Sequence, residues 1–406
     1  MQQTIIQRSP NGKGKLWSGE YIFLLGINLL LAISFYMIAP VLPKYAIQLG
    51  ASLSLAGIIA GLFSITALVA RPFGGLLADR INKKRILFIA TSVLSFSAFG
   101  YCFSTTIPFL VGFRILHGIA FSISSTAVIA LAVSFIPIER LGEGVGYFGL
   151  GQILSSAVGP NIGIWVGQKY GLPFTFGLSG VILLVSALLI TLIHRETASD
   201  AILAASQRKK KLIMGDLIAV ELLPLALMGG VFSMTNGLVS SFLVLIGDAR
   251  HIANIGLYFS INALCLLFVR PFAGRLSDKK GLALILIPAL ILTALESLLL
   301  ANASVLWVVL IAAACKAFGQ GSAQPSLQSA CIKKLGPERS GVATSTFYIG
   351  ADIGQGLGPM MGGAIAGAFG YQTMFYSSAA VLGVVFLAFG IFKLISHNKL
   401  ELRNAN

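Results

Sequence analysis

The chain carries the stretch RPFGGLLADR at residues 71–80, and a near copy, RPFAGRLSDK, stands at residues 270–279. The two copies are 199 residues apart, and the same offset carries Gly159-Pro160 onto Gly358-Pro359. A register kept over so long a distance indicates an internal repeat. The sequence therefore predicts two structural halves of similar length.

The composition indicates a membrane protein. Hydrophobic residues make up 56% of the 406 residues and charged residues only 11%, and the mean hydropathy is +0.88. So few polar side chains cannot cover the surface of a soluble globule of this length. The four cysteines lie in apolar segments without C-x-x-C spacing, which indicates packing residues, and no metal site is expected.

Apolar runs long enough to cross a bilayer as a helix, which takes about 20 residues, occur six times in each repeat. They begin near residues 19, 52, 86, 106, 143 and 172, and then near 217, 251, 282, 305, 340 and 372. We therefore predict an all-α membrane protein with twelve transmembrane helices in two six-helix pseudo-repeats. The predicted segments are an N-terminal segment (1–18), a first bundle (19–194), a linker (195–215), a second bundle (216–396) and a tail (397–406).

Lysine and arginine residues indicate the orientation. With the N-terminus in the cytoplasm, 22 of the 29 fall in cytoplasmic segments, and only Lys44, Lys169 and Arg250 fall in segments on the outer side of the membrane. The positive-inside rule then predicts a multi-pass protein of the cell membrane with both termini cytoplasmic. The same distribution explains the formal net charge of +15, so nucleic acid is not expected as a partner. The first apolar run lacks a cleavage site and is predicted to be a transmembrane helix.

The loop between the second and third predicted helices has the pattern Gly75-x-Leu77-x-Asp79-Arg80-x-x-Lys83-Lys84, with a partner at Gly274-x-Leu276-x-Asp278. Together with the repeat and the twelve runs, it resembles the signature of the major facilitator superfamily, and the resemblance covers about residues 18 to 396. Asn82 stands where that family usually has glycine, and asparagine tolerates a left-handed turn.

The resemblance implies that this loop gates a conformational change. Asp79 and Asp278 would hold helix ends together in one state, beside Gly75, Gly274, Arg80, Lys83 and Lys84. The alternative is a topology signal made of basic residues alone.

Two further motifs narrow the subclass. Leu110-x-x-x-Arg114-x-x-His117-Gly118 on the fourth helix resembles a motif whose buried arginine is thought to take part in proton coupling. Gly159-Pro160 on the fifth helix approximates the Gly-Pro motif of exporters that exchange substrate for protons, and Gly358-Pro359 is a fuller copy on the eleventh. Such glycines and prolines permit bending, or serve ordinary close packing.

Charged residues deep in the membrane are candidates for a functional site, because burying an ionised group costs on the order of several kcal/mol. Helix offsets, at a rise of ~1.5 Å per residue, place three of them there: Arg114, Lys316 and Asp352. Asp352 is either a proton carrier or one member of a permanent ion pair with Lys316 that neutralises two buried charges. Arg71 and Arg270 are expected to snorkel or to have structural partners, and Glu296 is expected at the lipid interface.

The resemblance also implies a central cavity lined by helices one, four, seven and ten. The titratable residues of these helices away from their ends are Arg114, His117 and Lys316. A cavity of this sign favours anionic or zwitterionic substrates. The further residues predicted to line it are Asn28, Tyr36, Phe232, Asn236, Gln320 and Gln324.

Within the superfamily, the chain is most similar to the twelve-helix drug and proton antiporters, including exporters of opine metallophores. This implies proton-coupled export of a small organic molecule by a functional monomer that uses the proton gradient and no cofactor. Two alternatives stay open: proton-coupled import of a sugar or organic acid, and a lipid flippase or non-transporting sensor. An ATP-driven pump and an enzyme are not expected, because neither a G-x-x-x-x-G-K loop nor a catalytic constellation is visible.

Overall fold

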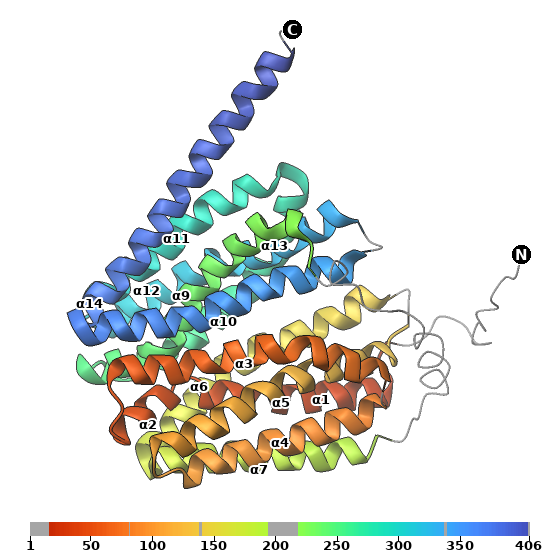
Figure 1. Ribbon diagram of the computed structural model, residues 1–406, viewed down its shortest axis with the longest axis vertical. Helices are drawn as coiled ribbons and strands as arrows, with labels where there is room; N and C mark the ends of the chain where they lie inside the picture. Colours follow the sequence, from red (N-terminus) through yellow and green to blue (C-terminus); the bar gives the residue numbers. More distant parts are fainter. Residues whose placement is uncertain (1–15, 81, 138–139, 194–217, 337–338, 405–406) are drawn as a thin grey trace, which may run out of the picture.

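The computed structural model describes residues 16–80, 82–137, 140–193, 218–336 and 339–404, and regular secondary structure within these ranges is helical throughout (Figure 1). The predicted linker 195–215 and most of the predicted N-terminal segment 1–18 lie outside the described residues. The first half comprises α1 (Gly19–Ile38), α2 (Leu42–Gln48), α3 (Leu53–Arg80), α4 (Lys83–Phe103), α5 (Ile107–Val133), α6 (Leu141–Tyr170) and α7 (Leu172–Thr191).

The second half begins with a short 3-10 helix, η3 (Val220–Leu222). Then follow α9 (Leu223–Ala249), α10 (Leu257–Lys280), α11 (Leu282–Asn302), α12 (Leu306–Phe318), α13 (Gln320–Leu335) and α14 (Ser340–Asn404). The long α14 is two helices joined at Gly370, whose φ of 84° is the left-handed conformation that glycine adopts freely.

Side-chain caps fix the starts of α1 and α4 in the first half. The Ser18 side chain accepts a hydrogen bond from the backbone N–H of Tyr21 at the start of α1, and the Asn82 side chain accepts one from Arg85 at the start of α4. Asn82 has φ −54° and ψ 120°, so the expectation of a left-handed turn at this residue is wrong. Asparagine is accommodated here as a helix cap, whereas Gly281 in the second copy has a left-handed φ of 88°.

The helices identify a multi-pass membrane protein. Among the described residues, nine helical segments are long and apolar enough to cross a membrane. Large apolar side chains such as Val69, Phe96, Phe103 and Leu188 are more than half exposed. In a bilayer, such side chains meet lipid tails.

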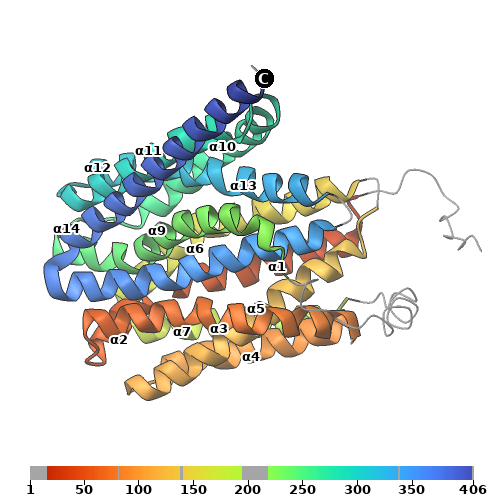
Figure 2. The ribbon, with the colours of Figure 1, turned by 45° about the horizontal axis from the view of Figure 1, so that its top comes forward.

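The two halves meet along α3 and the first part of α14, which lie side by side (Figures 1 and 2). Small residues make this contact close: a Cβ added to Gly57 would stand 3.0 Å from the Cα of Gly363, and one added to Gly363 would stand 3.0 Å from the Cα of Gly57. Backbone approach of this kind is the typical use of glycine in membrane helix interfaces.

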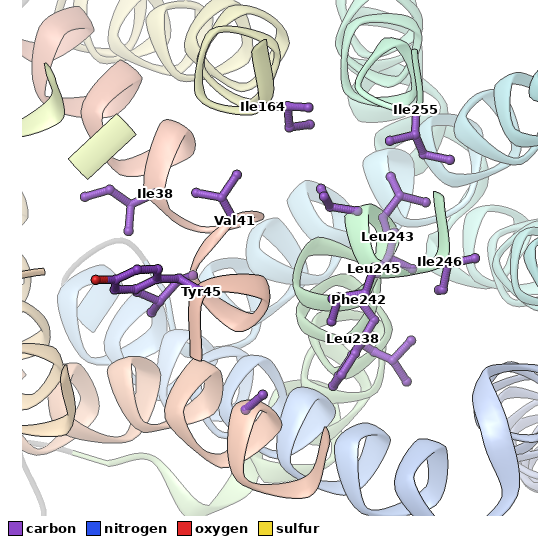
Figure 3. Close-up of a cluster of buried hydrophobic side chains, with 14 of the residues drawn as sticks. Ile38, Val41, Tyr45, Ile164, Leu238, Phe242, Leu243, Leu245, Ile246 and Ile255 are labelled. Atoms are coloured by element: carbon purple, nitrogen blue, oxygen red, sulfur yellow. The ribbon is translucent and has the colours of Figure 1, made fainter. Parts of the chain in front are cut away.

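A second contact between the halves lies at the end of the molecule where α3 begins, which we call the Leu53 end. There the ammonium of Lys44 lies 2.6 Å from the carboxylate of Asp248, and the Asn161 amide donates to the Ser260 hydroxyl at 2.9 Å. Buried apolar side chains from α1, α2, α6 and α9 form a continuous cluster at this end, including Ile38, Val41, Ile164, Leu238 and Phe242 (Figure 3). Apolar packing, an ion pair and a hydrogen bond therefore join the two halves at the Leu53 end.

Candidate substrate cavity

A cavity of about 440 Å³ lies between the halves and is lined by residues of both. Its size suits a small organic ligand. The wall combines aromatic, amide and charged side chains, among them Tyr36, Arg71, Arg114, Gln152, Asn236, Arg270, Lys316, Gln320, Gln324, Tyr348 and Asp352. The predicted lining residues Tyr36, Asn236, Gln320 and Gln324 are thus in this wall.

Arg114 is held against α3 at the edge of the cavity. Its guanidinium donates to the backbone carbonyls of Ile59 at 3.1 Å and Ala60 at 2.9 Å, and it lies 4.7 Å from the ring centroid of Phe63. Arg114 is only 4% exposed, so carbonyl dipoles and an aromatic face compensate much of its charge.

Asp352 of α14 forms an ion pair with Arg71 of α3, across the two halves. The Arg71 Nη2 group donates to Asp352 Oδ1 at 3.0 Å, and a second bond joins Arg71 Nε to Asp352 Oδ2. Arg71 also lies 5.7 Å from the ring centroid of Tyr348. The pairing of Lys316 with Asp352 considered from the sequence is therefore wrong. Helix offsets predict a similar depth for the two residues, but the helix that carries Asp352 packs against α3.

Lys316 instead belongs to a buried group with Tyr258 and Glu296. Its ammonium lies 5.5 Å from the ring centroid of Tyr258, and the Tyr258 hydroxyl donates to Glu296 Oε1. Glu296 is fully buried, so the expectation of a lipid-interface position is wrong. A buried carboxylate needs compensation, and the charge of Lys316 and the Tyr258 hydroxyl supply it.

Three predicted residues lie apart from the cavity wall. His117 is buried beside Tyr101, with 2.9 Å between its Nδ1 and the Tyr101 hydroxyl. Phe232 packs into the apolar core of the second half, and Asn28 is buried, its Nδ2 without a hydrogen-bond partner. The side chain of each residue faces a neighbouring helix. The order of the helices in the sequence does not show which way a side chain faces.

The predicted bending residues lie on the helices that bridge the halves. Pro160 and Pro359 stand inside α6 and α14 and line the cavity. A Cβ at Gly159 would stand 2.9 Å from the carbonyl of Ile33, and one at Gly358 would stand 2.9 Å from the carbonyl carbon of Met234. The repeated Gly-Pro pairs thus give tight packing and an interrupted hydrogen-bond ladder together.

The predicted gating residues lie at the ends of α3 and α10. Gly75, Asp79 and Arg80 belong to α3, and Gly274 and Asp278 belong to α10, but the structure describes no more than the backbone of these residues. Lys83 begins α4. The Lys84 ammonium donates to the carbonyls of Thr191 at 2.9 Å and Ile193 at 2.6 Å, so it caps the end of α7.

Sequence reasoning missed several wall residues. Arg71 has a structural partner, as the sequence predicts, namely Asp352, but the position of Arg71 and Arg270 in the cavity wall is not predicted. Gln152 on α6 and Asn262 on α10 also line it. The sequence signal that could have identified Gln152 and Asn262 as wall residues is a polar amide side chain in an otherwise apolar run.

A helical protein with many membrane-length segments and a polar cavity between two halves is built for membrane transport. Sequence comparison gives the family. The chain belongs to the Major Facilitator Superfamily, whose profile matches residues 24–251 and 225–405. Members of this family are transporters and not enzymes.

Two relatives are similar over most of their length. The chain is 27% identical over 369 residues to the multi-drug resistance efflux pump PmrA of Streptococcus pneumoniae, covering 87% of this chain and 90% of the relative. It is 28% identical over 367 residues to the multidrug resistance protein MdtG of Citrobacter koseri, covering 86% and 88%.

Solved structures share the fold. A mutant of the nucleoside transporter NupG superposes with a TM-score of 0.75 at 14% identity, covering 91% of this chain and 99% of that one. A POT family transporter gives a TM-score of 0.76 at 15% identity, covering 92% and 95%.

Proposed function

We propose that the chain is a secondary active exporter, which moves a small organic molecule outward in exchange for protons. The observation that carries this proposal is the similarity, over nearly the full length, to proteins named as multidrug efflux pumps. A cavity of about 440 Å³ lined by both halves supports it. The basic residues Arg114, Arg270 and Lys316 in the wall favour an anionic, zwitterionic or carboxylate-bearing drug-like substrate.

The proposed architecture is twelve transmembrane spans in two repeats, with bundles at 19–194 and 216–396 joined by a cytoplasmic linker. The described helices support this count. In the first half α1 and α3 to α7 give six spans, because α2 is too short to cross. In the second half α9, α10 and α11 give three, α12 and α13 are two parts of one span interrupted at Gly319, and α14 divides into two at Gly370. We further propose a functional monomer in the cell membrane with both termini cytoplasmic, on the distribution of basic residues.

In this topology the Leu53 end faces outward. The Lys44–Asp248 ion pair, the Asn161–Ser260 hydrogen bond and the apolar cluster then close the outer side. We infer that the cavity communicates with the cytoplasm in this state. Rocking of the two halves about the cavity would open the other side, as expected for repeats related by an axis along the membrane normal.

We propose Asp352 as the proton carrier. Its carboxylate lines the cavity, and its partner Arg71 belongs to the opposite half. Relative movement of α3 and α14 would therefore change the charge beside the carboxylate. Arg114 and His117 would support this step from α5, and Glu296 is the alternative carrier.

Purified protein in proteoliposomes tests the proposal. An imposed pH gradient should drive uphill movement of a substrate dye, and a protonophore should stop it. Asp352→Asn should abolish uphill movement while exchange at equal pH continues. Uphill transport by the parent without any response to the pH gradient would contradict proton coupling, and uphill transport by Asp352→Asn would exclude Asp352 as the carrier.

A further inference from the structure

The repeat makes Arg71 and Arg270 equivalent residues, because each begins the Arg-Pro-Phe stretch of its half. The Gly-Pro pairs fix the register of α6 against the first part of α14 by the same offset of 199 residues. That register makes Ile153 the equivalent of Asp352, and Gly149 the equivalent of Tyr348.

The contacts of the two arginines in the structure agree with this equivalence. Arg71 of α3 reaches Asp352 and Tyr348 on α14. Arg270 of α10 reaches the matching turn of α6, since its Nη1 atom lies 4.0 Å from the position that a Cβ on Gly149 would take. Both arginines thus point at corresponding places of the opposite half.

The two arginines differ in what they find there. Arg71 meets a carboxylate and an aromatic ring, whereas the turn of α6 that Arg270 reaches has a glycine and the apolar residue Ile153 at the equivalent positions. Within the described ranges, Arg270 has neither a carboxylate partner within 4.0 Å nor a hydrogen bond. Its side chain is exposed and lines the cavity, together with Ile153.

A guanidinium remains charged at any physiological pH and forms its strongest contacts with carboxylates, through two parallel hydrogen bonds. Beside Arg270, the missing side chain at Gly149 leaves space, and the missing acid at position 153 leaves the charge uncompensated. Two further wall atoms, Asn262 Oδ1 and Gln320 Oε1, are buried without a hydrogen-bond partner. They can accept hydrogen bonds from the donor groups of a ligand.

We propose that Arg270 is a binding subsite for a carboxylate of the transported molecule, which takes the place that Asp352 has beside Arg71. Ile153 packs against the apolar part of the ligand. The assignment rests on the proposed function only in identifying the ligand with the transported substrate. Binding itself can be measured without a proton gradient.

The sharpest variant adds the missing partner instead of removing the arginine. Ile153→Asp puts a carboxylate where the repeat register predicts one, and Ile153→Asn is a control of the same shape without the charge. The probes are rhodamine B, which has a free carboxylate, and rhodamine B ethyl ester, which has the same ring system without that negative charge. Fluorescence anisotropy of the detergent-solubilised protein, at fixed pH and ionic strength, gives the two affinities.

We expect the wild-type protein to bind rhodamine B about ten-fold more tightly than the ester, the scale of one charge-assisted contact. Ile153→Asp should remove this preference, because its carboxylate occupies Arg270. Ile153→Asn should change both affinities in parallel and keep the ratio. Arg270→Gln should also remove the preference, without adding a charge to the wall. Size-exclusion chromatography checks that each variant is folded.

Three outcomes would overturn the subsite: a wild-type protein that binds both dyes equally or neither, a preference that survives in Arg270→Gln, or equal ratios in Ile153→Asp and Ile153→Asn. Transport in proteoliposomes separates this result from the proposed function. A carboxylate preference in binding with no response of transport to a pH gradient would contradict proton-coupled export while supporting the subsite.

Discussion

The ion pair between Arg71 and Asp352 gives a quantitative prediction about stability. The Asp352 side chain is 14% exposed and the Arg71 side chain is 30% exposed. Arg71→Gln therefore leaves a mostly buried carboxylate without its cation. Removing one partner of a fully buried pair costs about 3–5 kcal/mol, and an exposed pair contributes at most about 1 kcal/mol.

For this intermediate exposure we expect a loss of about 2 kcal/mol in the free energy of unfolding, or about 30-fold in the equilibrium constant. Arg270→Gln is a control within the same molecule, since this equivalent arginine has no carboxylate partner among the described residues. It should cost less than about 0.5 kcal/mol. The double variant Arg71→Gln/Asp352→Asn should recover most of the loss, because the unpaired charge is gone.

Reversible unfolding in mixed detergent micelles, followed by tryptophan fluorescence, measures these differences in a protein with three tryptophans. The double-mutant cycle isolates the energy of the pair. Equal losses for Arg71→Gln and Arg270→Gln, or additive losses for the two members of the pair, would refute the inference that Asp352 depends on Arg71.

Three further predictions concern transport. Asp79→Asn should leave insertion and abundance nearly unchanged while transport falls severely, and normal transport by the well-expressed variant would remove the gating hypothesis. Lys316→Gln should weaken binding of rhodamine B about ten-fold, measured by anisotropy, and efficient export of ethidium-like cations with no export of acids by the parent would contradict the predicted substrate charge. Gly57→Leu should overpack the contact with Gly363, at a cost of about 1–3 kcal/mol, and open the outer side. Cysteines placed at the Leu53 end should then react faster with a membrane-impermeant thiol reagent. An unchanged rate would show that this contact does not hold the closed state.

Much of the fold could be predicted from the sequence because its signals are long. An apolar run of membrane length extends over about 20 residues, and nine helical segments of this kind are present among the described residues. Helix starts were harder, because they depend on single side chains. Asn82 shows this: its side-chain oxygen caps α4 at residue 85, whereas its residue type equally suits a left-handed turn.

The neighbours of the buried charges could not be predicted in the same way. The rise per residue gives the depth of a side chain in the membrane, but an apolar helix does not reveal which way each residue faces. Lys316 and Asp352 came out at similar depth, yet Asp352 contacts Arg71, and Lys316 lies near Tyr258 and Glu296. Their true partners follow only from the packing of α14 on α3 and of α12 on α10 and α11.

Once the contact between Arg71 and Asp352 is known, the repeat identifies the equivalent positions in the other half. The two halves keep the residues that shape the backbone, such as the Arg-Pro and Gly-Pro pairs. They differ at the positions that compensate charge, where Asp352 on one side corresponds to Ile153 on the other. A symmetric pair of ion pairs would neutralise both arginines and hold both interfaces of the halves in the same way. Of these two, only the pair between Arg71 and Asp352 is present among the described residues. It holds α3 against α14, whereas the guanidinium of Arg270 is available to a ligand in the cavity. The same asymmetry therefore accounts for a stabilising contact between the halves and for a basic cavity wall.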